Sequence, residues 1–156
     1  MHMLKPIFLN PQFMRVSFQS VEDAAMSSYQ NLRAIMIDAV REYCAEHYFR
    51  PYIWVEVDSA CRVPSEYVKD GMIILDIDDE AVRGFQMNDE YLSFEARFGD
   101  ETDSMEIVVP LNRVVHVAAA EQAVEGASFM ASPTSPELLE KLTGSSVAPR
   151  RPMRIK

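Results

Sequence analysis

The chain has 156 residues, of which 48% are hydrophobic and 25% charged, and its formal net charge at pH 7 is −9. This length and composition fit one domain with a substantial core. No stretch approaches the roughly 20 consecutive apolar residues that a membrane-spanning helix needs, and the N-terminus lacks the pattern of a secretory signal. We therefore expect a cytoplasmic protein that does not interact with membranes.

The charge is unevenly distributed along the chain. The last twelve residues carry Arg150, Arg151, Arg154 and Lys156 and no acidic residue, so residues 1–144 bear a formal charge of −13. An acidic body of this kind repels nucleic acid. The short basic end is typical of either a separate docking element or a solvated tail.

The N-terminal region changes character near Met26. Residues 1–25 follow neither the helical nor the strand period, and we predict that the native chain starts at Met26. We accordingly assign residues 1–27 to an N-terminal extension that is disordered or not native.

A helix of about four turns is predicted next, with Ser28 as its N-terminal cap and Pro51 ending the pattern. Its apolar positions recur at helical spacing and are Leu32, Ile35, Met36, Ala39, Val40, Tyr43, Cys44 and His47. This stripe needs a partner, either the body of the domain or another subunit.

Beyond Pro51 the apolar period changes to two, which indicates strands separated by turn signals. The predicted strands are Tyr52–Val57, Met72–Ile77, Phe85–Met87, Tyr91–Phe98, Met105–Val109 and Val114–Ala119. Short strands with tight connections predict a mainly β domain with an N-terminal α-helix, arranged as a small antiparallel barrel or sandwich. The domain spans residues 28–131, and a linker at 132–148, with one or two helical turns over Pro136–Leu142, leads into a flexible C-terminal tail.

The chain offers little support for catalysis or metal binding. The acidic cluster from Asp76 to Glu80 fails as a calcium loop, because Ala81 and Met87 stand where a glycine and a bidentate glutamate are needed. His47 and His116 have no nucleophile beside them in sequence, and the five glycines form no phosphate-binding loop. The two cysteines, Cys44 and Cys61, lack a Cys-x-x-Cys spacing and are predicted to stay reduced. We therefore expect no enzyme, no metal and no cofactor.

Small barrels often bind RNA by stacking bases on aromatic side chains, and Tyr91, Phe94 and Phe98 could serve in this way. The acidic body and the inward-type face of Phe94 and Phe98 favour core packing instead. A small RNA-binding regulatory barrel nevertheless remains the alternative function.

Three ordered segments resemble a known family. The stretch VPSEYVKDGMIILDIDDEAV, residues 63–82, is followed by NDEYLSFEARFGD at 88–100 and VPLNRVVHV at 109–117. Together with the RRPMRIK end they resemble stringent starvation protein B, an adaptor that enhances the specificity of the protease ClpXP. The resemblance covers residues 31–129 and, separately, the C-terminal peptide.

This resemblance implies an SH3-like or Sm-like barrel whose groove binds ssrA degradation tags, a dimerising helix, and a C-terminal peptide that docks on the N-terminal domain of the ClpX unfoldase. The implied partners are ClpX, ssrA-tagged polypeptides and a second copy of the chain. The implied peptide-binding residues are Tyr67, Val68, Ile73, Ala96, Arg97, Phe98 and Val117. The implied dimer interface comprises Leu32, Ile35, Met36, Ala39, Val40 and Tyr43. The implied docking peptide, at 149–156, uses Arg151, Pro152, Met153, Arg154, Ile155 and Lys156.

Two departures from the family pattern stand out. Ala118 occupies a position where the family has an aromatic residue, and Asp100 replaces the second glycine of Arg-Phe-Gly-Gly.

Overall fold

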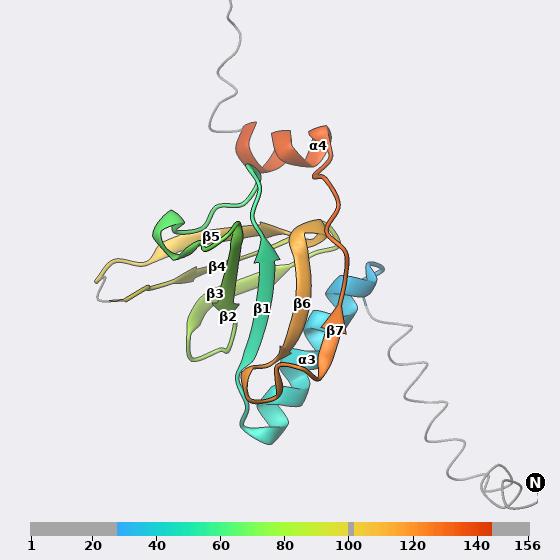
Figure 1. Cartoon of the computed structure of the whole chain (residues 1–156), viewed down its shortest axis with the longest axis vertical. Helices are drawn as coiled ribbons and strands as arrows, with labels where there is room; N and C mark the ends of the chain where they lie inside the picture. Colours follow the sequence, from blue (N-terminus) through green and yellow to red (C-terminus); the bar gives the residue numbers. More distant parts are fainter. Residues whose placement is uncertain (1–27, 100–101, 145–156) are drawn as a thin grey trace, which may run out of the picture.

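A computed structural model describes residues 28–99 and 102–144, and it contains two antiparallel sheets and a long N-terminal helix (Figure 1). The principal elements are α3 (Leu32–His47), β1 (Pro51–Glu56), β2 (Met72–Asp76), β3 (Val82–Met87), β4 (Tyr91–Ala96), β5 (Met105–Pro110), β6 (Val114–Ala119), β7 (Gly126–Ser128) and α4 (Pro136–Leu139). Short helical turns η2 (Ser65–Tyr67), η3 (Leu111–Arg113), η4 (Ala120–Gln122) and η5 (Glu140–Gly144) join them. The mainly β class with an N-terminal helix is confirmed.

Helix α3 has the predicted length but a different cap. Asn31, rather than Ser28, is the N-cap, and its side chain accepts a hydrogen bond from the Arg33 backbone N–H at 2.8 Å. Asn31 is itself fixed because its backbone N–H and its side-chain amide both donate to Asp89, in the turn before β4. The helix ends at Tyr48, whose left-handed conformation (φ 61°) lets its N–H bond the Cys44 carbonyl.

The first sheet has the strand order β2-β1-β6-β7, with β1 and β6 in its centre. β1 alternates between the core and the outer face, so that Ile53 and Val55 are fully buried while Trp54 lies on the outer face. Helix α3 packs against β1 and β6 behind this sheet, with Ala34 and Ile37 in the core (Figure 1). Helix α3, at the start of the domain, thus covers the inner face of the sheet at β1 and β6.

The second sheet has the order β3-β4-β5, and its central strand places Leu92 and Phe94 in the shared core. The predicted barrel is not closed. The strands form two sheets, because the turn between β2 and β3 carries the chain from one to the other without ladder pairing between those strands. An isolated bridge between Arg62 and Val108 connects the loop after β1 to β5.

The chain continues past β6 into the short strand β7, which the sequence did not predict. It then runs along the body to α4 and η5 (Figure 1). Leu138 is buried there, and the Lys141 ammonium lies 2.5 Å from the Glu90 carboxylate. This part of the predicted linker therefore contacts the domain. The predictions for the N-terminal extension at 1–27 and for the docking peptide at 149–156 lie outside the described residues.

Within the described part of the chain, no helix is both long and apolar enough to cross a bilayer. The same residues contain no cluster of three histidine, cysteine or acidic side chains placed to hold a metal ion.

Candidate peptide-binding site

The candidate site lies where the central strand of the second sheet ends. Ala96 is the last residue of β4, and its backbone stands opposite Val82 of β3 on one side and Met105 of β5 on the other. Its side chain is only a methyl group and is partly exposed. A small residue at this point leaves space above the sheet end, and two concave surfaces meet there.

The first of these surfaces, called the arginine pocket here, has a volume of about 280 Å³. It is lined by Glu80, Ala81, Val82, Arg83, Glu95, Ala96, Arg97 and Ser104. Its lining contains two arginines and two glutamates, so its formal charges cancel. The pocket is therefore suited to polar or charged groups.

The second surface, called the apolar pocket here, has a volume of about 400 Å³. It is lined by Val63, Pro64, Ser65, Glu66, Ala96, Phe98, Asp103, Ser104 and Met105. Ala96 and Ser104 line both pockets, so the two surfaces adjoin at the sheet end. We call the pair the Ala96 groove. A ligand crossing Ala96 would meet hydrophobic side chains together with the carboxylates of Glu66 and Asp103 on one side, and both guanidinium and carboxylate groups on the other.

Four of the seven predicted peptide-binding residues gather at this groove. Ala96, Arg97 and Phe98 line it, and the Tyr67 ring packs against Phe98 with ring centroids 5.4 Å apart. Tyr67 is 41% exposed, and its hydroxyl lies directly over Gly99. The stretches at 63–82 and 88–100, which carry the family resemblance, are thus neighbours in space.

The other three predicted residues lie elsewhere. Ile73 and Val117 are 2% and 0% exposed and belong to the hydrophobic core, while Val68 packs partly buried against it. Neither Ile73 nor Val117 lines the Ala96 groove.

Sequence reasoning missed Arg83 and Met105, both of which line the groove. The signal that could have found them is strand pairing, because the partners of β4 must flank Ala96 once β3-β4-β5 is recognised as a meander. Phe94, by contrast, is 2% exposed and cannot stack on a base. This removes one of the three aromatics on which the RNA-binding alternative depends.

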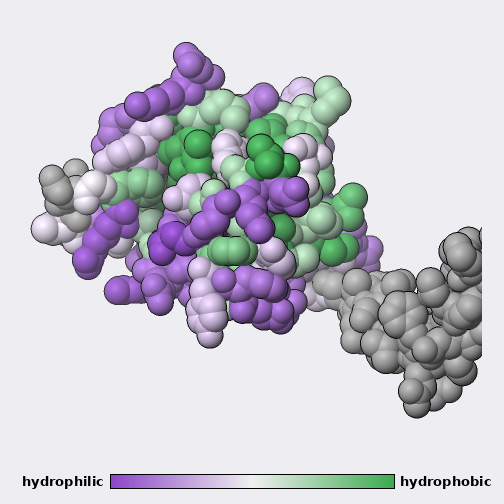
Figure 2. Space-filling view, turned by 60° about the horizontal axis from the view of Figure 1, so that its bottom comes forward, coloured by the Kyte–Doolittle hydropathy of each residue, from purple (hydrophilic) through white to green (hydrophobic). Residues whose placement is uncertain are grey.

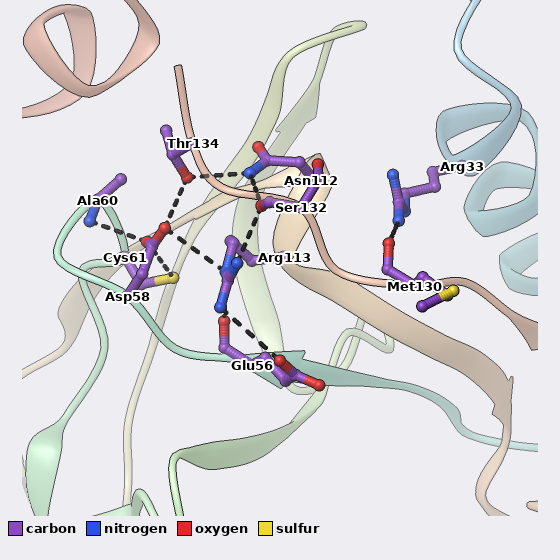
Figure 3. A network of polar contacts seen from close by, with 10 residues as sticks. All are labelled: Arg33, Glu56, Asp58, Ala60, Cys61, Asn112, Arg113, Met130, Ser132 and Thr134. Carbon is purple, nitrogen blue, oxygen red and sulfur yellow. Dashed lines mark hydrogen bonds and ion pairs between the residues drawn. The ribbon is translucent and has the colours of Figure 1, made fainter. Parts of the chain in front are cut away.

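A polar network fixes the segment after β7 to the body of the domain (Figure 3). The Arg113 guanidinium donates to the carbonyls of Glu56 at 2.8 Å and Ser132 at 2.9 Å. Asp58 accepts from the Thr134 hydroxyl at 2.7 Å and lies 3.5 Å from the Arg113 Nε. Because Arg113 ends the turn η3 before β6 and Asp58 lies in the loop after β1, two separate parts of the domain hold the outgoing chain at a defined place.

The same network contains a thiol. Cys61 Sγ lies 3.6 Å from the Asp58 carboxylate, and burial raises the pKa of the Cys61 thiol to about 11. At neutral pH the group is therefore a neutral thiol, as expected for a structural cysteine. Among the described residues both cysteines are free, in agreement with the prediction that they are not paired.

Helix α3 carries a second apolar stripe that is only partly exposed, because Met36 packs partly buried against the core and the Tyr43 hydroxyl donates to the Gln122 side chain. Leu32, Met36, Ala39 and Tyr43 follow one another at spacings of four, three and four residues, so they share one face. Leu32 is 63% exposed and Tyr43 41% exposed. Figure 2, which views the molecule from the end at which α3 stops, shows apolar patches broken by hydrophilic side chains.

A comparison with known families shows to which family the chain belongs. The description of the matching family is "Stringent starvation protein B", and the match extends over residues 26–150. The chain belongs to the stringent starvation protein B family. It is also 30% identical over 98 residues to the stringent starvation protein B homolog of Haemophilus influenzae, a match that covers 62% of this chain and 63% of that relative. The aligned region is thus slightly less than two thirds of the relative's length.

One departure from the stringent starvation protein B pattern has a structural reason. Ala118 is fully buried, and its backbone stands opposite Gly126 of β7. A Cβ added at Gly126 would lie 2.6 Å from the Ala118 Cβ and would collide with the Val117 carbonyl. The close approach of β7 therefore requires small residues at both positions, and an aromatic residue at 118 does not fit this arrangement.

The remaining polar candidates have structural partners. Asp76 and Asp79 form ion pairs with Arg50 and Arg41, each at 2.6 Å, which accounts for half of the acidic cluster. His116 has both ring nitrogens within 2.7 Å of oxygen atoms, those of Ser128 and of the Ala123 backbone. These residues thus stabilise turns and the edge of the sheet.

Proposed function

We propose that this protein is a non-enzymatic adaptor that binds ssrA-type degradation tags in the Ala96 groove and delivers the tagged polypeptide to the ClpX unfoldase. The observation that carries the proposal is the groove itself, formed where Ala96 separates an apolar pocket from an arginine pocket in a member of the stringent starvation protein B family. An extended peptide satisfies such a site because its alternate side chains enter separate pockets.

Delivery requires a second contact, which we assign to the peptide at 149–156. Its alternating arginine and apolar residues would dock on the unfoldase, while the groove holds the tag. Tethering raises the local concentration of the tag at the unfoldase, and the gain depends on the length of the connecting chain. The network around Arg113 shortens that connection, because the chain is held to the body through Thr134.

We further propose that two copies associate through the outer stripe of α3. Ala34, Ile37 and Cys44 are already buried against the sheets, so the stripe beginning at Leu32 is the face left for a partner. A symmetric dimer would place the same stripe of both copies in contact. Two tails per assembly would then engage an unfoldase of several subunits.

The test of tag binding is fluorescence anisotropy with a labelled ssrA-type peptide. We expect micromolar or tighter binding by the native protein and loss of at least about tenfold in affinity for Ala96→Gln, whose longer side chain would fill the junction of the two pockets. Ala45→Gln is the matched control, because Ala45 is an exposed helical residue that does not line the groove. Equal affinity of Ala96→Gln and the native protein would refute the location of the site, and absence of binding by all three would refute tag binding.

Delivery is tested separately by deleting residues 149–156. The truncated protein should bind the tag peptide with unchanged affinity but should no longer accelerate degradation of a tagged substrate by ClpXP. Simultaneous loss of both activities would contradict the division into a binding domain and a docking peptide.

A further inference from the structure

Two arginines differ from all the others in the described ranges 28–99 and 102–144. Five arginines make hydrogen bonds or ion pairs with protein groups, namely Arg33, Arg41, Arg50, Arg62 and Arg113. Within those ranges Arg83 and Arg97 make none. Both are exposed, and both line the arginine pocket.

The position of Arg83 results from an irregularity in β3. Arg83 stands opposite Glu95 of β4, but the register then shifts, so that Gln86 stands opposite Ser93. One extra residue is therefore accommodated in β3, and Gly84 has a φ of 67°, which side chains other than glycine rarely adopt. A bulge of this kind bends the strand and redirects the neighbouring side chains.

The carboxylate of Glu95, which stands opposite Arg83, does not form an ion pair with the Arg83 guanidinium. The Glu95 carboxylate instead lies 3.4 Å from the Ser104 hydroxyl that donates to it. Arg83 and Arg97 thus border one pocket with their donors available. Two guanidinium groups around one cavity are suited to a carboxylate, which can accept hydrogen bonds on both oxygens.

We infer that Arg83 is a specificity-determining residue which, together with Arg97, recognises a carboxylate side chain of the bound peptide next to the residue seated on Ala96. This inference rests on the proposed function and names the chemical class of ligand that the site selects. The apolar pocket on the other side of Ala96 takes a hydrophobic side chain of the same peptide. The preferred ligand is therefore an extended peptide with an acidic residue near a hydrophobic one.

Glu80 and Glu95 lie in the same pocket and act in the opposite direction. Their carboxylates repel an acidic side chain, so the affinity for an acidic peptide is lower than two arginines alone would give. Removing one of these negative charges should therefore increase affinity for an acidic peptide and leave a neutral peptide unaffected. A gain of affinity cannot result from partial unfolding of the variant.

The experiment compares a labelled ssrA-type peptide with the same peptide in which every Asp and Glu is replaced by Asn and Gln. Anisotropy is measured with the native protein and with Arg83→Gln, Arg97→Gln and Glu95→Gln. Arg62→Gln is the matched control, because Arg62 is also exposed and lies beside this sheet, through its bridge to Val108 of β5, but pairs with Glu106 and does not line the groove.

We expect Arg83→Gln to weaken binding of the acidic peptide about fivefold and Glu95→Gln to strengthen it about twofold, with changes below about 1.5-fold for the neutral peptide and for Arg62→Gln. Equal effects of Arg83→Gln on the two peptides, or no effect on either, would overturn the role of Arg83 while leaving tag binding intact. If neither peptide binds and Ala96→Gln changes nothing, both the inference and the proposed function fail.

Discussion

Replacing Arg113 with alanine should destabilise the whole domain. The Arg113 side chain is only 15% exposed, donates to the Glu56 and Ser132 carbonyls, and lies 3.5 Å from the Asp58 carboxylate. A hydrogen bond to a charged group contributes about 1.5–3 kcal/mol, and truncation also leaves its partners unsatisfied. We expect a loss of about 2–4 kcal/mol in the free energy of unfolding, which is on the order of 10 °C in melting temperature for a domain of this size.

The assay is urea denaturation monitored by the fluorescence of Trp54, the only tryptophan in the chain. The control is Arg62→Ala, because its ion pair with Glu106 joins side chains that are 47% and 56% exposed. Exposed pairs of this kind contribute less than about 1 kcal/mol. If the unfolding free energies of Arg113→Ala and Arg62→Ala differ by less than about 0.5 kcal/mol, the reasoning about the network is refuted.

Three further predictions concern the thiols, β7 and helix α3. Burial raises the pKa of the Cys61 thiol to about 11, so at pH 8 this thiol should react with a disulfide reagent on the order of 100-fold more slowly in the native than in the urea-unfolded protein. The stability that the neutral thiol contributes should be complete below about pH 8.5 and should be lost as the pH rises through 11. Equal reaction rates in both states would contradict burial of the thiol. Ala118→Tyr, which restores the family's aromatic residue, should lower the unfolding free energy by about 1–3 kcal/mol because Gly126 leaves no space, and unchanged stability in urea denaturation would show that β7 does not lie as described. If two copies associate through α3 as proposed, the native protein should sediment as a dimer and Met36→Asp as a monomer with unchanged affinity for the tag peptide; a native monomer would refute the proposed association, and a dimer that persists in Met36→Asp would place the interface elsewhere.

The sequence predicted the elements well where the apolar period is clear. β6 has the predicted bounds, Val114–Ala119, because an apolar run follows the turn signal at Pro110 and stops before the polar residues Glu121 and Gln122. β7 was missed because Gly126–Ser128 is three residues long, and no period can be detected over such a length. Ser28 and Asn31 are both good capping residues, and only the hydrogen bonds between Asn31 and Asp89, 58 residues apart, select the second.

The candidate site was less predictable for a physical reason. In β2 both faces are apolar, with Ile73 and Leu75 on one and Met72 and Ile74 on the other, so alternation alone does not tell which face is buried. The structure buries Ile73 and leaves Ile74 52% exposed. Arg83 could not be assigned to a pocket because the bulge at Gly84 changes the side-chain direction, and bulges depend on pairing rather than on local pattern.

The hydrogen bonds between the first and last parts of the domain also determine when the chain can finish folding during synthesis. Arg33, at the beginning of α3, donates to the carbonyl of Met130, 97 residues later, and Asp58 accepts from Thr134, 76 residues later. Such distant partners slow folding, because the loop between them must be ordered before either bond forms. A nascent chain therefore cannot complete its fold until residues 130–134 have left the ribosome. We expect chains that end before residue 130 to lack these hydrogen bonds and to be cleaved by proteases more readily than the full chain.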